Sequence, residues 1–363
     1  MTERSEEMKL NRTNPNDGSL PEKQPGDEKV PDPAGSLTGT SFRIWTLDDI
    51  LAERESLRQP WHVNYYAMYS SIWGGCVRDP LLMQVPADDH VVHRGDGVFE
   101  TMKCVDGSVY ALPQHLARLK SSAQAIHLSP LFSEGALQDI VLKTVVAGGN
   151  RNALVRMILS RGPGSFGVNP ADCPKTELYI IVYRLPPSFM EMHPEGAHAI
   201  RSQIAVKPSW FATIKSCNYL PNVLMKREAS EAGADFALGF DEEGRLTESA
   251  TENVGIVTSD LDLVLPEPGR MLEGITMERV AKLAAARPFC GGVRSVCRAA
   301  IHEGMLRQAR EVLIFGTTPD VTSVVHYEEV SIGEGRPGPV QSILHRLLVK
   351  DICANPDFRT PAF

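Results

Sequence analysis

The apolar residues of this chain form two kinds of short run, which predict strands and helices. Continuous or alternating apolar runs predict strands, whereas apolar residues spaced by three and four predict amphipathic helices. The predicted strands are Met83–Pro86, Val98–Val105, Ser108–Leu112, Ala153–Arg161, Leu178–Tyr183, Ala199–Val206, Leu263–Leu265 and Glu311–Gly316. The predicted helices are Thr46–Leu57, Pro113–Ile126, Gly135–Val146, Leu220–Ala232, a helix within Met271–Ala286, and Ser342–Ile352. Because these elements follow no regular strand–helix–strand rhythm, an α+β fold is favoured over a doubly wound sheet.

Two local signals strengthen these assignments. The Asp106-Gly107 turn joins two of the predicted strands and predicts a β-hairpin. Apolar residues also share one face of two predicted helices. They are Leu116, Leu119 and Ala123 in the first helix, and Leu220, Val223 and Leu224 in the second.

The chain divides by composition into a tail and two domains. Residues 1–40 are rich in proline, glycine and charge, which predicts a disordered tail. The segment Arg184–Ser188 (RLPPS) interrupts the pattern of strands and is the predicted linker. We therefore expect a small N-terminal domain at 41–184 and a larger one at 185–363.

Composition limits the classes of partner. The chain has 37 Lys and Arg against 45 Asp and Glu, a net charge of −8, which argues against binding nucleic acid. Its seven cysteines form no CxxC pair, so neither a metal site nor a disulfide framework is indicated. No apolar run is long enough to span a membrane. The N-terminus resembles neither a secretory signal nor a transit peptide, and the expected location is the cytoplasm.

The segment from Thr213 to Val257 carries the first candidate chemistry. Lys215 ends a β-like run, and a lysine amine becomes a nucleophile when burial or nearby cations lower its pKa. Glu248 lies at a turn between two short predicted strands. A carboxylate in such a position can keep a pyridine nitrogen protonated, as an electron-sink cofactor requires.

Three further segments could bind an anion. Gly274-Ile275-Thr276 opens a helix, with Thr276 as its expected N-cap, and free amides at a helix start bind phosphate. Thr317-Thr318 offers hydroxyls and amides after a strand. Arg118, on the helix face opposite Leu119, offers a planar fork of donors. Each of these features alone is usually an ordinary surface or capping residue, and it is their order and spacing that carries the prediction.

Together these segments resemble the class IV, or fold type IV, family of pyridoxal-phosphate enzymes. That family includes branched-chain aminotransferases, D-amino-acid aminotransferases and aminodeoxychorismate lyase. The resemblance runs from about Met68 to Ile352 and rests on the segments HRGDGVFET, HLARLKSSA, IKSCNYL, LTESATENV, MLEGITMERV and FGTTPDVTSV. The segment MYSSIWGG together with DDHVVHRGDGVFET most resembles a plant and bacterial subgroup of D-aminotransferase-like proteins.

The resemblance implies a homodimer of two-domain α+β subunits, the larger domain having a β-barrel-like core. It implies pyridoxal 5'-phosphate as the cofactor, bound in the interdomain cleft, with Lys215 forming the aldimine and serving as general base. The implied cofactor-binding residues are Arg118, Glu248, Leu272, Ile275, Thr276 and Thr317. The implied substrate-binding residues are Phe99, Arg156, Thr318 and Tyr219.

The implied reaction is a ping-pong transamination between an amino acid and a 2-oxo acid such as 2-oxoglutarate. In SRGPGSFGVNP, Phe166 and Val168 replace the arginine and histidine of D-amino-acid enzymes, and GVNP resembles branched-chain enzymes instead. Arg156 also stands where branched-chain enzymes place a pocket arginine, and in a strand it would face away from Arg161. GDGVFET and the short KSCNYL spacing resemble the D-amino-acid and lyase branches.

We therefore predict D-amino acids as donors ahead of branched-chain L-amino acids. A lyase of the aminodeoxychorismate type and a non-catalytic cofactor-binding protein are the remaining alternatives.

Overall fold

The structure, a computed structural model, describes residues 42–129, 131–289 and 292–363. The described residues fall into two units, 42–52 and 53–363. The first unit contains α1 (Leu47–Ala52), whose start is capped by Thr46: its hydroxyl oxygen accepts the N–H of Asp49 at 3.2 Å. The helix predicted across Thr46–Leu57 is interrupted at Glu53, and α2 (Arg54–Leu57) belongs to the second unit. The predicted tail at 1–40 lies outside the described residues.

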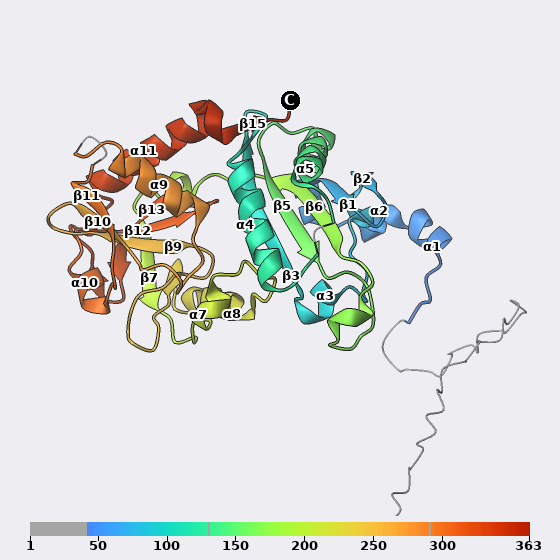
Figure 1. Ribbon diagram of the computed structural model, residues 1–363, viewed down its shortest axis with the longest axis horizontal. Helices are drawn as coiled ribbons and strands as arrows, with labels where there is room; N and C mark the ends of the chain where they lie inside the picture. The colour runs from blue at the N-terminus through green and yellow to red at the C-terminus, as the bar shows by residue number, and fades with distance from the viewer. Residues whose placement is uncertain (1–41, 130, 290–291) are drawn as a thin grey trace, which may run out of the picture. The chain divides into compact units, whose positions relative to one another are not determined.

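Seven strands of the second unit form an antiparallel sheet in the order β15-β4-β3-β5-β6-β1-β2 (Figure 1). They are β1 (Tyr65–Ser70), β2 (Gly75–Val77), β3 (Gly97–Val105), β4 (Ser108–Tyr110), β5 (Ala153–Ser160), β6 (Glu177–Arg184) and β15 (Arg359–Pro361). The hairpin predicted at Asp106-Gly107 is present, since Cys104 pairs with Val109 and Val105 with Ser108. The central pair, β3 and β5, is in register from Gly97–Ser160 to Cys104–Ala153.

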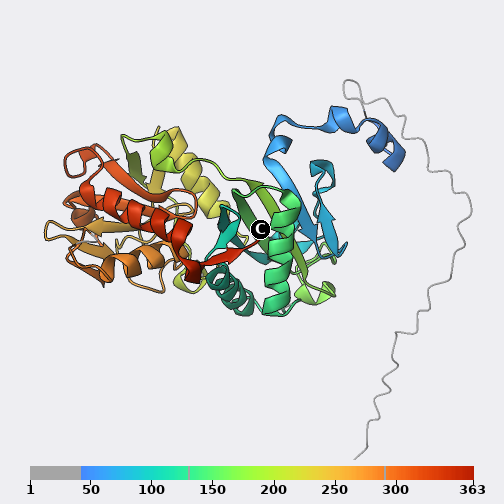
Figure 2. The same cartoon turned by 90° about the horizontal axis from the view of Figure 1, so that it is seen from above.

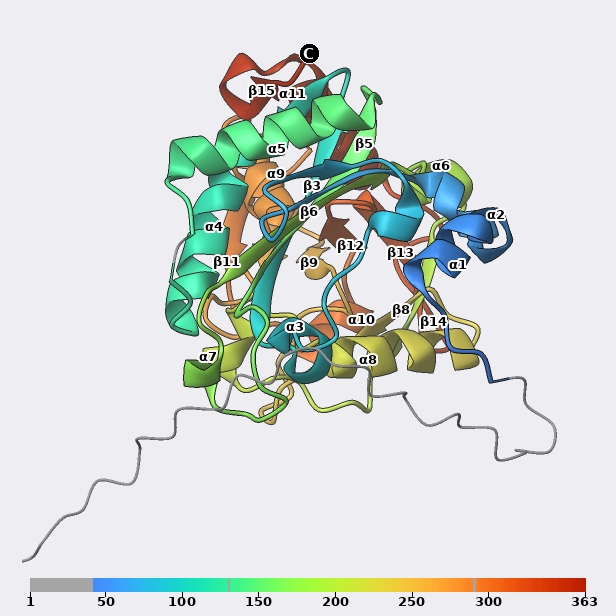
Figure 3. The same cartoon turned by 90° about the vertical axis from the view of Figure 1, so that its right-hand side faces the viewer.

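Two helices cover one face of this sheet, α4 (Leu112–Ala125) and α5 (Glu134–Gly148) (Figure 3). The predicted core face of α4 is correct, because Leu116, Leu119 and Ala123 are buried against the sheet. Alternate residues of β3, such as Val98 and Met102, enter the same core. Phe99 and Thr101 therefore point to the other face.

Eight strands form a second, mixed sheet in the order β11-β10-β9-β12-β13-β7-β8, with β14 paired to β13. They are β7 (Ala197–Arg201), β8 (Phe236–Leu238), β9 (Asn253–Val257), β10 (Asp262–Leu265), β11 (Ser295–Arg298), β12 (Glu311–Gly316), β13 (Asp320–Tyr327) and β14 (Val330–Ser331). The helices α9 (Ile275–Ala285) and α11 (Pro339–Ala354) pack on one face, and α10 (Glu303–Arg307) on the other (Figure 1). The order of hydrogen-bonded strands is open, with β11 and β8 at its edges.

Short helices complete the second unit at the loops between strands. They are α3 (His90–Arg94), α6 (Phe189–Met192), α7 (Ser209–Ala212), α8 (Leu220–Glu231) and the 3-10 turns Pro60–Asn64, Pro80–Leu82, Pro170–Asp172 and Pro356–Phe358.

Several predicted elements are wrong in detail. Met83–Pro86 is not a strand, because none of the described strands pairs with it. It follows directly on the 3-10 turn Pro80–Leu82. The run before Lys215 is the helix α7, not a strand. The strand predicted at Ala199–Val206 ends at Arg201. The predicted apolar face of α8 is not core, since Leu220 and Val223 are 68% and 59% exposed.

Two features tie the sheets together. The chain runs from α11 back to the first sheet, where β15 pairs with β4 (Figure 2). A buried ion pair joins β3 to the start of β13, with Lys103 Nζ 2.6 Å from Asp320 Oδ1. The domain boundary at 184/185 remains a prediction. The strand β15 lies in the predicted C-terminal domain by sequence, but it pairs in the seven-stranded sheet formed mostly by residues before 185.

Candidate active site

The backbone around Lys215 is fixed to the first sheet on two sides. The N–H of Phe99 donates to the carbonyl of Lys215 at 2.9 Å, and the N–H of Cys217 donates to Gly97 at 2.8 Å. The N–H of Lys215 itself donates to Ser122 Oγ on α4 at 3.2 Å. These bonds hold the Lys215 segment against the start of β3 without a strand of its own.

The amine of Lys215 lies between two aromatic rings. Its Nζ is 3.5 Å from the hydroxyl of Tyr219 and 4.8 Å from the ring centroid of Phe99. The two rings meet edge to face, with centroids 5.0 Å apart. Burial and the nearby guanidinium of Arg118 lower the pKa of Lys215 to about 8. A substantial fraction of this amine is therefore neutral near physiological pH.

Glu248 lies at the end of a turn that packs beside β8 and β9. Its backbone carbonyl accepts the N–H of Gly239 at 2.9 Å, and its Oε2 accepts the N–H of Leu272 at 3.1 Å. Burial raises the pKa of Glu248 to about 7, while the cation of Lys207 and the bond from Leu272 oppose that rise. Near pH 7 the carboxyl group is therefore present in both its ionised and its neutral form.

Arg118 points inward from α4 and is paired with a carboxylate that the sequence did not single out. Its Nε and Nη2 donate to the two oxygens of Glu100 at 2.8 and 2.7 Å, and its Nη1 donates to the carbonyl of Glu273 at 3.0 Å. His115 Nδ1 lies 2.6 Å from the same carboxylate. Burial alone would raise the pKa of Glu100, but Arg118 and His115 bring it to about 2. His115 and Arg118 lie three apart on one helix face, but this spacing does not identify the carboxylate that they share.

The N-terminus of α9 lies across from Arg118, and its N-cap is Gly274 rather than the expected Thr276. Among the described residues no side chain caps this helix, so the first amides of α9 are free of a side-chain acceptor. Only glycine fits at 274, because a Cβ there would lie 1.8 Å from Asn253 Oδ1. Asn253 in turn holds the loop by donating from Nδ2 to the carbonyl of Leu272 at 2.7 Å.

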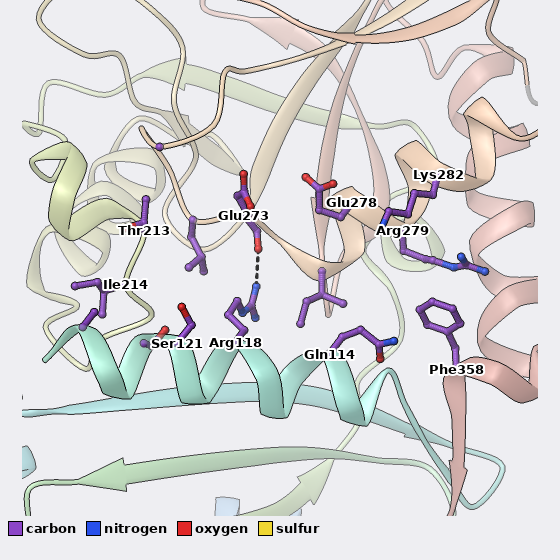
Figure 4. A pocket seen from close by; sticks show the side chains of 15 residues that line it. Gln114, Arg118, Ser121, Thr213, Ile214, Glu273, Glu278, Arg279, Lys282 and Phe358 are labelled. Atoms are coloured by element: carbon purple, nitrogen blue, oxygen red, sulfur yellow. Dashed lines mark hydrogen bonds between the residues drawn. The ribbon is translucent and has the colours of Figure 1, made fainter. Parts of the chain in front are cut away.

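A cavity of about 580 Å³ opens between α4 and the start of α9 (Figure 4). Arg118, Leu272 and Ile275 are among the residues that line it. The hydrogen bond from Arg118 to Glu273 joins two of its lining residues (Figure 4). A second and much smaller cavity is lined by Ile275, Thr276 and Thr317. Ile275 lines both cavities, so the residues predicted to bind phosphate come from three segments and are divided between two cavities that share Ile275.

The predicted substrate residues are brought together except for one. The guanidinium carbon of Arg156 lies 5.3 Å from the ring centroid of Phe99, and its Nε donates to Thr101 Oγ1 at 3.3 Å. Tyr219 and Phe99 already flank Lys215. Thr318 is exposed in the turn after β12, whereas its neighbour Thr317 donates from Oγ1 to the carbonyl of Thr101 at 3.3 Å.

Arg161 is held by Asp96 and by the backbone that follows α4. Arg161 makes two hydrogen bonds of 3.0 Å to Asp96 and donates to the carbonyls of Ile126 and His127. Phe166 in the following loop is 66% exposed.

The described ranges contain no group of His, Cys, Asp and Glu side chains arranged to hold a metal ion. No helix within those ranges is long and apolar enough to cross a membrane.

Comparison with known proteins places this geometry in context. Residues 97–327 match the sequence profile of the family described as Amino-transferase class IV. The chain is 36% identical to a D-amino-acid transaminase, chloroplastic, of Arabidopsis thaliana, over 80% of this chain and 78% of that protein. It is 31% identical to a putative branched-chain-amino-acid aminotransferase of Methanocaldococcus jannaschii, over 71% of this chain and 87% of that protein.

A solved structure has the same fold. The T.th. branched-chain amino acid aminotransferase with pyridoxamine 5'-phosphate superposes with a TM-score of 0.76 at 26% identity, covering 82% of this chain and 99% of that one. The predicted α+β fold is confirmed, and its strands lie in two sheets.

Proposed function

This chain belongs to the class IV aminotransferases and is a pyridoxal-phosphate-dependent transaminase, and we propose that its preferred amino donors are D-amino acids. The family, the reaction type and the cofactor predicted from the sequence are confirmed. The substrates of the family are an amino acid and a 2-oxo acid. The enantiomer, the individual site residues, the assembly and the location are the parts that we propose.

The residues around Lys215 fit the cofactor. Lys215 supplies a partly buried amine of lowered pKa, and Glu248 supplies a carboxylate oriented by the N–H of Leu272. The N-terminus of α9, which no described side chain caps, offers amides at Ile275 and Thr276 for a phosphate, next to Arg118 and Thr317. We propose that these residues hold pyridoxal phosphate, with Leu272 against its ring. When bound, the cofactor supplies a reactive carbonyl and an electron sink.

The side chains of this protein have separate roles in the proposed reaction. Lys215 moves the proton at the substrate's α-carbon, for which its lowered pKa makes it suitable. Tyr219 and Phe99 confine the lysine amine between two rings. Arg156 is placed to contact an anionic substrate group, and its bond to Thr101 sets its direction. Thr318, exposed in the adjacent turn, is proposed as the remaining substrate contact.

One comparison carries the choice of enantiomer. The 36% identity to the Arabidopsis D-amino-acid transaminase, over 80% of the chain, supports D-amino acids. The 31% identity to the putative branched-chain-amino-acid aminotransferase and the fold match to the T.th. branched-chain enzyme support branched-chain L-amino acids as the second candidate.

A donor panel separates these functions. Purified holoenzyme is given D- and L-alanine, leucine and glutamate, with 2-oxoglutarate as acceptor (2-oxobutyrate for glutamate), and the keto acid products are measured. Activity with D-alanine and none with L-leucine is expected, and the opposite result would reverse the proposed enantiomer. Pyruvate release from aminodeoxychorismate without an acceptor would indicate the lyase, and no half-reaction with any donor would indicate a non-catalytic protein. Lys215→Ala is the matched inactive control.

We also propose that the chain acts as a homodimer. The face of α8 that carries Leu220, Val223 and Leu224 is apolar and exposed, and this helix begins directly after Tyr219. A contiguous apolar face of this kind is typical of a surface covered by a partner. Light scattering should give twice the chain mass of 39.8 kDa, and Val223→Asp should shift it toward the monomer.

The cytoplasm remains the proposed location. The free thiols of the described cysteines, namely Cys76, Cys104, Cys173, Cys217, Cys297 and Cys353, support a reducing compartment. Fractionation of the source cells would test it.

A further inference from the structure

Lys207 is a second lysine close to the site, and no motif in the sequence singles it out. It follows β7, and its Nζ lies 4.6 Å from the ring centroid of Tyr219 and 5.9 Å from that of Phe211. Within the described residues, its amine makes no ion pair and no hydrogen bond. A partly buried cation without such partners is costly, because aromatic faces replace only part of its hydration.

The group that Lys207 faces is Glu248. Both side chains line one small cavity between the loop after β7, the start of α8 and the turn that carries Glu248. Burial lowers the pKa of Lys207 and the charge of Glu248 opposes this, while Lys207 in turn opposes the rise in the pKa of Glu248. The titratable and charged groups near Glu248 are Lys207, Lys215, Tyr219, Glu252 and Arg270.

The other two cations near Glu248 are committed elsewhere. Arg270 donates from Nη1 to Asp241 Oδ2 at 2.9 Å. Lys215 has its amine against Tyr219 and Phe99, and it carries no charge once it has given up its proton. Lys207 is therefore the cation available to offset the charge of Glu248 throughout turnover.

We propose that Lys207 is a positioning residue that favours the ionised form of Glu248 and holds the ring of Tyr219 beside Lys215. This inference rests on the proposed role of Glu248 toward the pyridine nitrogen. An ionised Glu248 is required there, because a neutral carboxylic acid would not retain the nitrogen's proton. Lys207 Nζ lies over the ring of Tyr219, 4.6 Å from its centroid. The hydroxyl of the same tyrosine is 3.5 Å from Lys215 Nζ.

The test measures binding of pyridoxal phosphate to apoprotein between pH 6 and 9.5, by quenching of intrinsic fluorescence. Lys207→Gln removes the charge, and Lys207→Arg is the matched control that keeps it. If the loss of Lys207 raises the pKa of Glu248 by about one unit, the ionised fraction at pH 7 falls about fivefold. Lys207→Gln should then bind the cofactor about fivefold more weakly at pH 7 and as tightly as wild type at pH 9.5. Lys207→Arg should follow the wild-type curve.

A second background separates charge from packing. In Glu248→Gln protein there is no carboxylate to ionise, so adding Lys207→Gln should change the affinity equally at every pH. A loss of affinity for Lys207→Gln that is independent of pH, or that Lys207→Arg shares, would overturn the inference. Wild-type protein that takes up no cofactor would instead overturn the proposed roles of Glu248 and Lys215. If Lys207→Gln does not fold, Lys207→Met takes its place in the same series.

Discussion

The guanidinium of Arg118 and the carboxylate of Glu100 form a two-pronged ion pair beneath the predicted phosphate site. Its two hydrogen bonds measure 2.8 and 2.7 Å, and Glu100 is fully buried. The pair leaves Nη1 directed at the carbonyl of Glu273, at the edge of the cavity beside α9. Glu100 therefore fixes the direction in which Arg118 can offer its remaining donors.

Glu100→Gln should destabilise the protein because it leaves a partly buried guanidinium without its counter-charge. Removing one partner of a buried pair costs about 3–5 kcal/mol, and we expect the lower end because Gln still accepts one hydrogen bond. Urea unfolding of the apoprotein measures this. Glu231→Gln, which breaks the exposed pair with Arg227, is the control and should cost less than about 1 kcal/mol. Equal unfolding midpoints for the two variants would contradict a structural role for Glu100.

Lys215 should set the pH dependence of turnover. The lysine must be neutral to accept a proton, and its pKa is about 8. The rate should rise with pH between about 7 and 9 and then level off, because the neutral fraction grows from about one tenth to about nine tenths. Lys215→Arg, which keeps the charge and accepts no proton, should lose at least about a hundredfold in kcat.

A structural readout accompanies that measurement. Borohydride reduction of wild-type holoenzyme should leave the cofactor mass on the peptide that contains Lys215, and on no peptide of Lys215→Arg. A cofactor mass on Lys207 instead would mean that the wrong lysine was assigned.

The sequence predicted elements best where the chain's own pattern decides the structure. The core face of α4 and the limits of β12 follow from local apolar spacing, and both are correct. The strand β13 was missed because its polar residues Thr322 and Ser323 are buried between neighbours in the second sheet. Only the tertiary structure supplies those neighbours, and no periodicity along the chain reveals them.

In the candidate site, too, residues in local motifs could be predicted and residues defined by tertiary contacts could not. Lys215, Glu248 and Arg118 could be named because each lies in a motif with a recognisable order of residues. Glu100 and Lys207 could not, since their importance comes from the residues they face across the fold. The N-cap at Gly274 was also missed, because hydroxyl residues are preferred caps and the close approach of Asn253 is invisible in sequence.

Glu248 should make the apoprotein less stable as pH rises. Its pKa is raised by burial from 4.5 to about 7, so its contribution to stability is fully present below pH 4.5 and is lost as pH rises through about 7. Glu248→Gln has no charge to bury. The variant should be more stable than the wild type by less than about 1 kcal/mol at pH 5, and by at most about 3 kcal/mol at pH 8.

Urea unfolding of cofactor-free protein at the two pH values measures this difference, with Glu231→Gln as the exposed control that should show none. The stabilised variant should also bind pyridoxal phosphate more weakly, since Gln cannot pair with a protonated nitrogen. A gain in stability with a loss of cofactor affinity is the signature of a charge that is held in the fold for its chemistry. A difference between variant and wild type that is the same at pH 5 and pH 8 would show that Glu248 is not the group that titrates.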